Sequence, residues 1–509
     1  MLPSVITKTG RLETARNMFE GFFDFILDIP RNRAVVLDAK LTANYDSTDI
    51  GWHDHGMRDA KVLGRGFTSG PVSEAETVLS PNLVAISDVD EINQIYGIGT
   101  KFIKSPFYDL SAVYDEEGLV PDPFVIRHDK GLHSRMKRNA ANAYSMNGLV
   151  QFEPWINTVM DRLVAILDRN ASSGTVCDLG NLFKMFAMDA VCTLTMGRDL
   201  SYMEKGDHLG FFPTLDLFTS YMSIMGHVPW LHPVSLGNPT IAKYMTGSDK
   251  SGTALFDLAT KELERTRREP PAEDAPMTFL ARLGLNQDAN PKSITDREII
   301  THAFGNLSAG SDTTAAAMRS VFYNILRSSR AYARLAKDVR ENLQLPVTFT
   351  KAYAIPYLRA VIQEAMRLHP SVGQLLGRVV PPTGATIGKF YLAPGTEVGM
   401  SPWVVHRDPD IFPNPDAFIP ERWLVGENGT TEAQLRRMER SFLAFGHGSH
   451  TCSGKHISIM EVTKLVGTLL LKYDMEYVKI GEGYKFVNHW FTSQTGLNVA
   501  FRHVKGSNI

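Results

Sequence analysis

The chain has few cysteines. Its 509 residues include three, Cys177, Cys192 and Cys452, and no Cys-x-x-Cys pair. That pattern argues against both a disulfide framework and a structural zinc site. We therefore expect a reducing, intracellular compartment.

The sequence also lacks a long hydrophobic run. A membrane-spanning helix needs about 20 predominantly apolar residues. The best candidate, residues 18–30, contains Glu20, Asp24 and Asp28. We therefore expect no transmembrane helix in the chain as written. The aromatic side chains of this stretch suit peripheral contact with a membrane surface, although a packed helix is the simpler interpretation.

Neither sign of charge is in excess. The net charge is −2, and 43% of the residues are hydrophobic. This is an ordinary globular composition, and nothing in it points to a nucleic acid partner. The chain has no internal repeat, and we find no flavin or dinucleotide fingerprint in it.

One loop rich in glycine carries the most specific signal. Residues 442–461 read Phe-Leu-Ala-Phe-Gly-His-Gly-Ser-His-Thr-Cys-Ser-Gly-Lys-His-Ile-Ser-Ile-Met-Glu. Gly446 and Gly448 allow a sharp turn and close approach to a flat ligand, and Gly454 allows the same after the cysteine. Helical spacing of apolar residues follows, so Cys452 should precede a helix N-terminus. There the thiol should ionise more readily and bind a metal as thiolate.

Two other interpretations of this loop remain open. A lone cysteine is most often a small buried hydrophobe. Alternatively, His447, His450, Cys452 and His456 could form a cluster of transition-metal ligands.

A long helix is predicted over residues 296–328. Thr295 and Glu298 have the spacing of a capping box, and no proline follows until Pro346. Such a helix would be about 50 Å long. Its middle reads Ala-Gly-Ser-Asp-Thr-Thr over residues 309–314, and helix interiors disfavour glycine, serine, aspartate and threonine. This grouping indicates a local opening kept for function, or a close helix crossing.

Two further sets of residues have helical spacing. Glu364 and Arg367 follow Pro356 and lie three apart, so they can pair on one helix face. His133 and Lys137 lie four apart and could jointly meet a carboxylate.

The cysteine loop resembles the haem-binding signature of the cytochrome P450 family, Phe-x-x-Gly-x-Arg-x-Cys-x-Gly. Phe445, Gly448, Cys452 and Gly454 match it, and His450 stands where the family usually has arginine. The family's Ala/Gly-Gly-x-Asp/Glu-Thr, Glu-x-x-Arg and Pro-Glu-Arg elements occur in the same order. The resemblance covers about residues 76–501. Residues 83–97 and 104–108 are similar to fungal members such as pisatin demethylase.

The resemblance implies a cytochrome P450 fold, mainly α with a small β-rich portion. The catalytic domain is expected at residues 76–509. Residues 1–75 would be an atypical N-terminal segment without a clear transmembrane anchor.

The resemblance also assigns site residues. Cys452 would be the axial ligand of the iron in haem b, Thr313 would hydrogen-bond the activated oxygen, and Asp312 would relay protons. The other haem or oxygen contacts would be His133, Lys137, Ala309, Gly310, Arg378, Phe445, Gly446, His450 and Gly454. Glu364, Arg367 and Arg422 would support the cysteine loop from behind.

The implied function is insertion of one oxygen atom from O2 into a lipophilic small molecule, by hydroxylation or demethylation, in fungal secondary metabolism. Electrons would come from an NADPH-dependent cytochrome P450 reductase. Its docking face would include Arg436, Arg437, Arg440 and Lys455, unless these form a merely solvated face. The enzyme would reside at the endoplasmic reticulum membrane surface or in the cytoplasm.

Two rival functions are kept. A haem-thiolate isomerase or dehydratase would use no dioxygen, and the Asp312–Thr313 pair argues against it. A non-catalytic haem- or metal-binding protein would use the cysteine and histidines of the loop.

Overall fold

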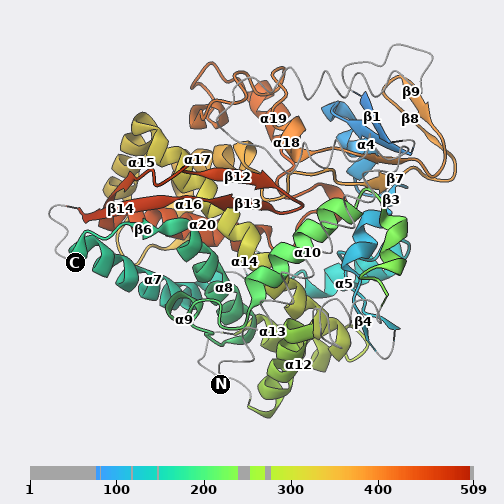
Figure 1. Ribbon diagram of the computed structural model, residues 1–509, viewed down its shortest axis with the longest axis horizontal. Coiled ribbons are helices and arrows are strands. Elements are labelled where there is room, and N and C mark those ends of the chain that lie inside the picture. Colours follow the sequence, from blue (N-terminus) through green and yellow to red (C-terminus); the bar gives the residue numbers. More distant parts are fainter. Residues whose placement is uncertain are drawn as a thin grey trace.

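Helices dominate the described part of the chain. The computed structural model describes residues 76–504, apart from 81, 116–117, 146–147, 149, 239–252 and 270–276. The predicted N-terminal segment 1–75, including the stretch at 18–30, lies outside the described residues. The predicted fold class, mainly α with a small β-rich portion, is confirmed (Figure 1).

The α-helices surround one long central helix. They are α4 (Ile92–Tyr96), α5 (Lys130–Ala140), α7 (Glu153–Ser173), α8 (Leu179–Met196), α9 (Tyr202–Lys205), α10 (Phe211–Met225), α12 (Thr253–Arg268), α13 (Phe279–Ala289), α14 (Asp296–Arg327), α15 (Ser329–Asn342), α16 (Phe349–Ala354), α17 (Pro356–Leu368), α18 (Pro402–Val405), α19 (Glu432–Arg440) and α20 (Lys455–Lys472). Short 3-10 helices are η1 (Val89–Glu91), η2 (Pro106–Ser111), η3 (Pro229–Val234), η4 (Pro420–Trp423) and η5 (Gly448–His450).

The strands form small sheets. They are β1 (Glu76–Ser80), β2 (Leu83–Ile86), β3 (Ile103–Lys104), β4 (Tyr114–Asp115), β5 (Gly118–Leu119), β6 (Cys177–Asp178), β7 (Arg378–Val379), β8 (Ala385–Ile387), β9 (Phe390–Leu392), β10 (Glu397–Gly399), β11 (Tyr473–Tyr477), β12 (Lys485–Asn488), β13 (Thr492–Thr495) and β14 (Asn498–His503). The largest sheet has the order β1-β2-β10-β7-β3, with β2 and β10 parallel and its other pairs antiparallel. It joins segments that are far apart in sequence.

The predicted long helix is α14. Its capping box is present: the Thr295 side chain accepts a hydrogen bond from the Glu298 backbone N–H, and the Glu298 side chain accepts one from the Thr295 backbone N–H. The helix ends at Arg327, one residue before the predicted end. It is continuous through residues 309–314, so the expected local opening does not interrupt it.

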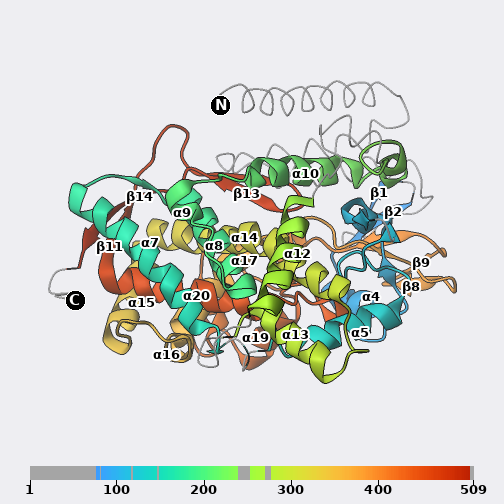
Figure 2. The same cartoon turned by 90° about the horizontal axis from the view of Figure 1, so that it is seen from below.

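The main core lies where α7, α8, α14, α17 and α20 meet. α14 packs along α8 on one side and contacts α17 and α20 as well. Figure 2 shows α10 and α19 on opposite sides of this core. The core therefore holds the helix with the Asp-Thr motif and the helix that follows the cysteine loop in one rigid body.

Candidate active site

The cysteine loop joins α19 to α20 and folds back on itself. The Cys452 amide donates to the Phe445 carbonyl at 2.8 Å, and the Gly446 amide donates to the Leu443 carbonyl at 2.8 Å. Gly446 has a φ of 69° and Gly448 a φ of 62°. Both lie in the left-handed region that favours glycine, as the sequence predicted.

The surroundings of the loop show why glycine is required at Gly448 but not at Gly454. A Cβ on Gly448 would lie 2.0 Å from the Tyr96 carbonyl oxygen at the end of α4, so the loop can pack there only with glycine. Gly454 is the N-cap of α20 with a φ of −77°, which any residue adopts. The expectation that Gly454 serves a second sharp turn is therefore wrong.

Cys452 is an exposed residue, and opposing influences act on the pKa of its thiol. Desolvation by the surrounding protein raises this pKa from 9.0, whereas the amides of Gly454 and Lys455 and the positive charges of Lys137 and Lys455 lower it. The sequence argument considered the helix N-terminus alone and so gave the wrong sign. A bound cation at the sulfur would supply the remaining stabilisation of the thiolate.

The predicted basic pair of α5 reaches the cysteine loop. Lys137 Nζ donates to the carbonyls of Ser449 at 3.0 Å and Thr451 at 2.7 Å. The His133 ring lies 4.4 Å from the His450 ring, centre to centre. The i, i+4 spacing thus places both α5 side chains against η5 and the residue that follows it.

Strand pairing adds Lys104 and Arg378 to this group. They face each other in register on β3 and β7. Arg378 Nε and His450 Nδ1 are buried without a hydrogen-bond partner. Burial first, and then the positive charges around it, lower the pKa of His450 to about 2; the contributing residues are Lys104, Arg378, His133 and Lys137. These side chains form the basic cluster: Lys104, His133, Lys137, Arg378 and His450.

The sequence analysis missed Lys104. Its ammonium donates to the carbonyls of Pro123 at 2.8 Å and Phe124 at 2.6 Å, and its side chain is buried. Burial first, and then the Arg378 charge, lower the pKa of Lys104 to about 7. Only the pairing of β3 with β7 could have identified it, and a two-residue strand gives little sequence signal.

The Asp-Thr motif presents two different faces of α14. Ala309 is exposed, and Thr313 Oγ donates to the Ala309 carbonyl at 2.7 Å. A Cβ on Gly310 would lie 2.9 Å from Val191 of α8. The small size of Gly310 therefore serves the crossing of α14 with α8, which was the structural alternative.

Asp312 is buried and pairs with a residue that the sequence analysis did not identify. Its Oδ1 lies 3.5 Å from Lys184 Nζ of α8. The same ammonium lies 3.5 Å from Asp216 of α10. Lys184 thus links the Asp-Thr motif to α10.

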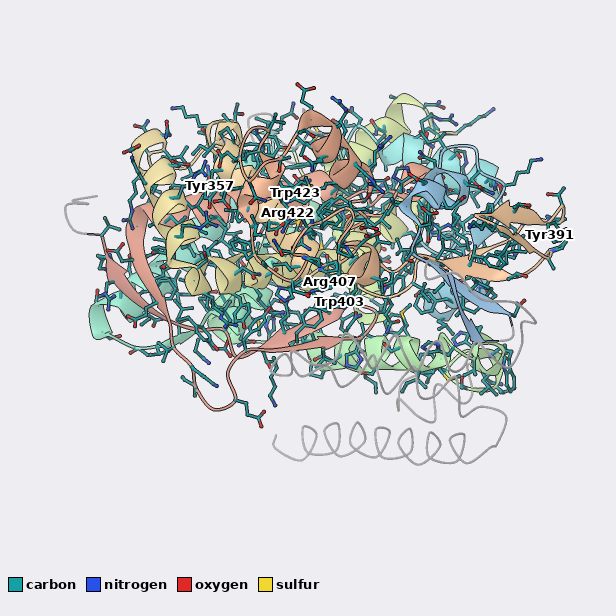
Figure 3. The ribbon with its side chains drawn as sticks, turned by 90° about the horizontal axis from the view of Figure 1, so that it is seen from above. Tyr357, Tyr391, Trp403, Arg407, Arg422 and Trp423 are labelled. Carbon is teal, nitrogen blue, oxygen red and sulfur yellow. The ribbon has the colours of Figure 1, made fainter. Side chains whose placement is uncertain are left out.

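The three side chains predicted to lie behind the loop meet one another, and a fourth joins them. Arg367 binds both Glu364 oxygens, at 2.8 and 2.9 Å, and Arg422 Nε donates to Glu364 at 3.0 Å. Trp423 Nε1 also donates to Glu364, at 2.9 Å. Figure 3 shows Arg422 and Trp423 side by side near Tyr357. The Glu364–Arg367 pair expected on one face of this helix is thus part of a buried network.

The histidines of the loop do not gather around the cysteine. Among the described residues there is no group of three or more His, Cys, Asp or Glu side chains placed to hold a metal ion. His447 Nε2 instead lies 2.9 Å from Asn93 Oδ1 of α4. The interpretation as a transition-metal cluster is therefore not supported.

A comparison with family models decides the identity of the fold. Residues 79–494 match the model described as "Cytochrome P450". The chain belongs to the cytochrome P450 family. Its members are haem-thiolate monooxygenases that hold haem b and receive electrons from NAD(P)H through a redox partner, and this chain is such an oxidoreductase.

Curated fungal cytochromes P450 are similar over most of the chain. The "Cytochrome P450 monooxygenase mpaDE" of Penicillium roqueforti is 35% identical over 83% of this chain, which spans 50% of that longer protein. A cytochrome P450 monooxygenase of Aspergillus terreus is 34% identical over 78% of this chain and 81% of its own length. The monooxygenase cicH of Emericella nidulans is 33% identical, over 84% and 86%.

The residues present fit haem b. The porphyrin carries two propionates, and the basic cluster offers Arg378 Nε and His450 Nδ1 as buried atoms without a partner. A thiol stands in the adjacent loop, and glycines 446 and 448 shape its backbone. Within the described residues, no helix combines the length and apolar character required to cross a bilayer.

Proposed function

We propose that Cys452 binds the haem iron as a thiolate and that the basic cluster receives the propionates. The observation that carries this proposal is the buried Nε of Arg378 and Nδ1 of His450, which have no partner beside the cysteine loop. A buried donor left unpaired costs about 1–3 kcal/mol, so such a group needs an acceptor. Propionate oxygens are acceptors of the right charge, because Lys104 and Lys137 lie close by.

The loop residues hold the sulfur rather than react. The Phe445 carbonyl accepts a hydrogen bond from the Cys452 amide, and Gly446 turns the chain so that this bond can form. The amides of Gly454 and Lys455 point at the thiolate and favour its charge. Bound haem supplies the redox chemistry, and the thiolate donates electron density to its iron.

Asp312 and Thr313, on α14 rather than on the cysteine loop, deliver protons to the reaction site. Lys184 Nζ lies 3.5 Å from Asp312 Oδ1 and so ties this carboxylate to α8. In the resting arrangement the Thr313 hydroxyl is held by the Ala309 carbonyl, from which it can turn to a ligand. An alcohol with a carboxylate behind it is a suitable path for protons from solvent. Ala309 leaves space beside that hydroxyl, whereas Gly310 serves the helix crossing.

The substrate is a lipophilic small molecule. An apolar cluster joins η2, α10 and the β12–β13 turn; its buried members are Tyr108, Leu110, Tyr221, Met222, Met225, Val228 and Trp490. Apolar side chains of this kind bind ligands by excluding water. The similar fungal monooxygenases support a role in secondary metabolism, with hydroxylation or demethylation as the reaction.

The electron donor is an NADPH-dependent reductase that docks on α19 and the start of α20. Arg436, Arg437 and Arg440 are exposed on α19, and Lys455 begins α20 directly after the loop. Exposed cations steer an acidic partner at long range. Figure 2 places α19 on the side opposite α10, the helix that contributes to the apolar cluster proposed for substrate. Contact with the endoplasmic reticulum membrane surface would not conflict with this arrangement.

One experiment separates this function from its rivals. The haem-loaded protein is supplied with a reductase, NADPH, a panel of lipophilic metabolites and isotopically labelled dioxygen. We expect one labelled oxygen atom in the product. Conversion without label would support an isomerase or dehydratase, and haem binding without NADPH-dependent conversion of any panel member would support a non-catalytic haem protein.

A further inference from the structure

His406 has both ring nitrogens engaged. It is 0% exposed, its Nδ1 lies 3.1 Å from the Arg367 carbonyl, and its Nε2 lies 2.8 Å from the Leu443 amide nitrogen. A carbonyl can only accept and an amide N–H can only donate. Nδ1 must therefore carry the proton while Nε2 accepts, which fixes one neutral tautomer.

Arg367 and His406 bind each other in both directions. The Arg367 guanidinium donates to the His406 carbonyl at 2.7 Å, while the His406 ring donates to the Arg367 carbonyl. The same guanidinium holds Glu364. The imidazole also stacks on Phe442, with ring centres 5.2 Å apart and planes inclined by 9°. His406 is thus part of the buried network and in contact with the first residue of the cysteine loop.

Hydrogen bonds continue from His406 to the cysteine. The Leu443 N–H donates a hydrogen bond to His406, and the Leu443 carbonyl accepts one from the Gly446 amide. Two residues further on, the Phe445 carbonyl accepts the Cys452 amide. A displacement of Leu443 would therefore be passed to the backbone that carries the sulfur.

We propose that His406 is a positioning residue that transmits the Glu364–Arg367 network to the cysteine loop and so sets the approach of Cys452 to the haem iron. The proposal rests on the proposed role of Cys452. Burial and the positive charges of Arg367 and Arg407 hold the pKa of His406 at about 3, so the required neutral form persists at working pH. Figure 3 shows Arg407, its neighbour in the chain, beside Trp403, over whose ring the Arg407 guanidinium lies.

Three substitutions separate positioning from simple packing. H406F keeps an aromatic ring against Phe442 but offers no acceptor to Leu443. H406Q retains a side-chain oxygen near the position of Nε2. The matched control is H369F. His369, the C-cap of α17, resembles His406 in lying among aromatic rings and in having a pKa of about 3. Its hydrogen-bond partners, however, are Ser320 and Asn324 of α14.

The readouts are hydrogen exchange of peptides spanning residues 443–452 and the carbon monoxide spectrum of the reduced, haem-loaded protein. We expect exchange at Leu443 to be about 10- to 100-fold faster in H406F, because its buried amide loses its acceptor. We also expect H406F to lose much of the red-shifted band of thiolate ligation. H406Q should restore most of both signals, and H369F should change neither.

Two results would overturn the proposal. One is H406F with parental exchange and spectrum; the other is H369F with the same changes as H406F. A parent protein without the red-shifted band would instead reject the proposed role of Cys452, while the exchange data would still test the bond from Leu443 to His406.

Discussion

Thr313 is the residue on which we expect oxygen chemistry to depend most directly. We expect T313A to keep its haem, because no contact of Thr313 supports the cysteine loop, and to divert reducing equivalents to hydrogen peroxide. Product formation should fall by about 100-fold, the lower end of what a positioned proton donor contributes. Peroxide and product per NADPH are the measurements. T313S, which keeps the hydroxyl, is the control, and unchanged coupling in T313A would exclude Thr313 from the mechanism.

Lys104 should make haem affinity depend on pH. Its pKa in the folded chain is about 7, against 10.5 for an unperturbed lysine. Between these values the unfolded chain binds the extra proton, so the stability of the haem-free protein rises with pH. A propionate beside Lys104 would restore its charge, so haem binding would take up a proton in the same interval.

The contribution of Lys104 to haem affinity is therefore expected to fall from pH 7 towards pH 10.5, by at most about tenfold per pH unit, while proton loss from Cys452 on binding acts in the opposite direction. In a haem titration, K104M should therefore make the slope of affinity against pH more positive than in the parent protein. K101M, at an exposed lysine three residues earlier, should leave it unchanged. An equal slope in K104M and the parent protein would remove Lys104 from the propionate site.

For individual residues, the sequence predicted which side chains lie near the cysteine loop better than it predicted their pKa shifts. His133, Lys137 and Arg378 were expected near the loop, and strand and helix geometry brings them there. Lys104 and Lys184 were missed, because their positions depend on strand register and helix crossing rather than on local pattern. The sign of the Cys452 pKa shift was also wrong, since desolvation depends on the whole surrounding structure.

Among the elements, we expect α17 and η4 to support the cysteine loop. E364Q would leave the buried guanidinium groups of Arg367 and Arg422 without their shared carboxylate. Breaking a buried pair in this way costs about 3–5 kcal/mol. We expect a lower melting temperature and little stable haem, measured as haem absorbance relative to protein.

The control for this prediction is E298Q. Glu298 is another buried glutamate, paired with Arg135 at the start of α14. It should lose stability while folded protein still takes up haem. Full haem loading of E364Q would show that the network does not support the loop.

Long elements were predicted well and for an identifiable reason. A capping box and the absence of proline delimited α14 to within one residue at its end. Short elements that depend on distant partners were not predicted: β8 and β9 pair with each other, whereas β10 pairs with β2 and β7. Such a parallel partner from the other end of the chain leaves no local trace in the sequence.

For the whole molecule, the distribution of exposed charge should govern electron transfer. We expect reversal of Arg437 and Arg440 to glutamate to raise the KM for the reductase by about tenfold at low salt, with less effect at high salt. Haem content and substrate binding should stay the same. Reversal of Arg502, which is exposed on β14, is the control. Equal effects of the two reversals would place the docking surface elsewhere.

The most direct test of the central claim is the carbon monoxide spectrum of the reduced protein. If Cys452 binds the haem iron as thiolate, folded parent protein should show the red-shifted band typical of such ligation, and C452S should lose it while other spectra report intact fold. A fully haem-loaded, folded parent protein without that band, or a C452S variant that retains it, would contradict the account.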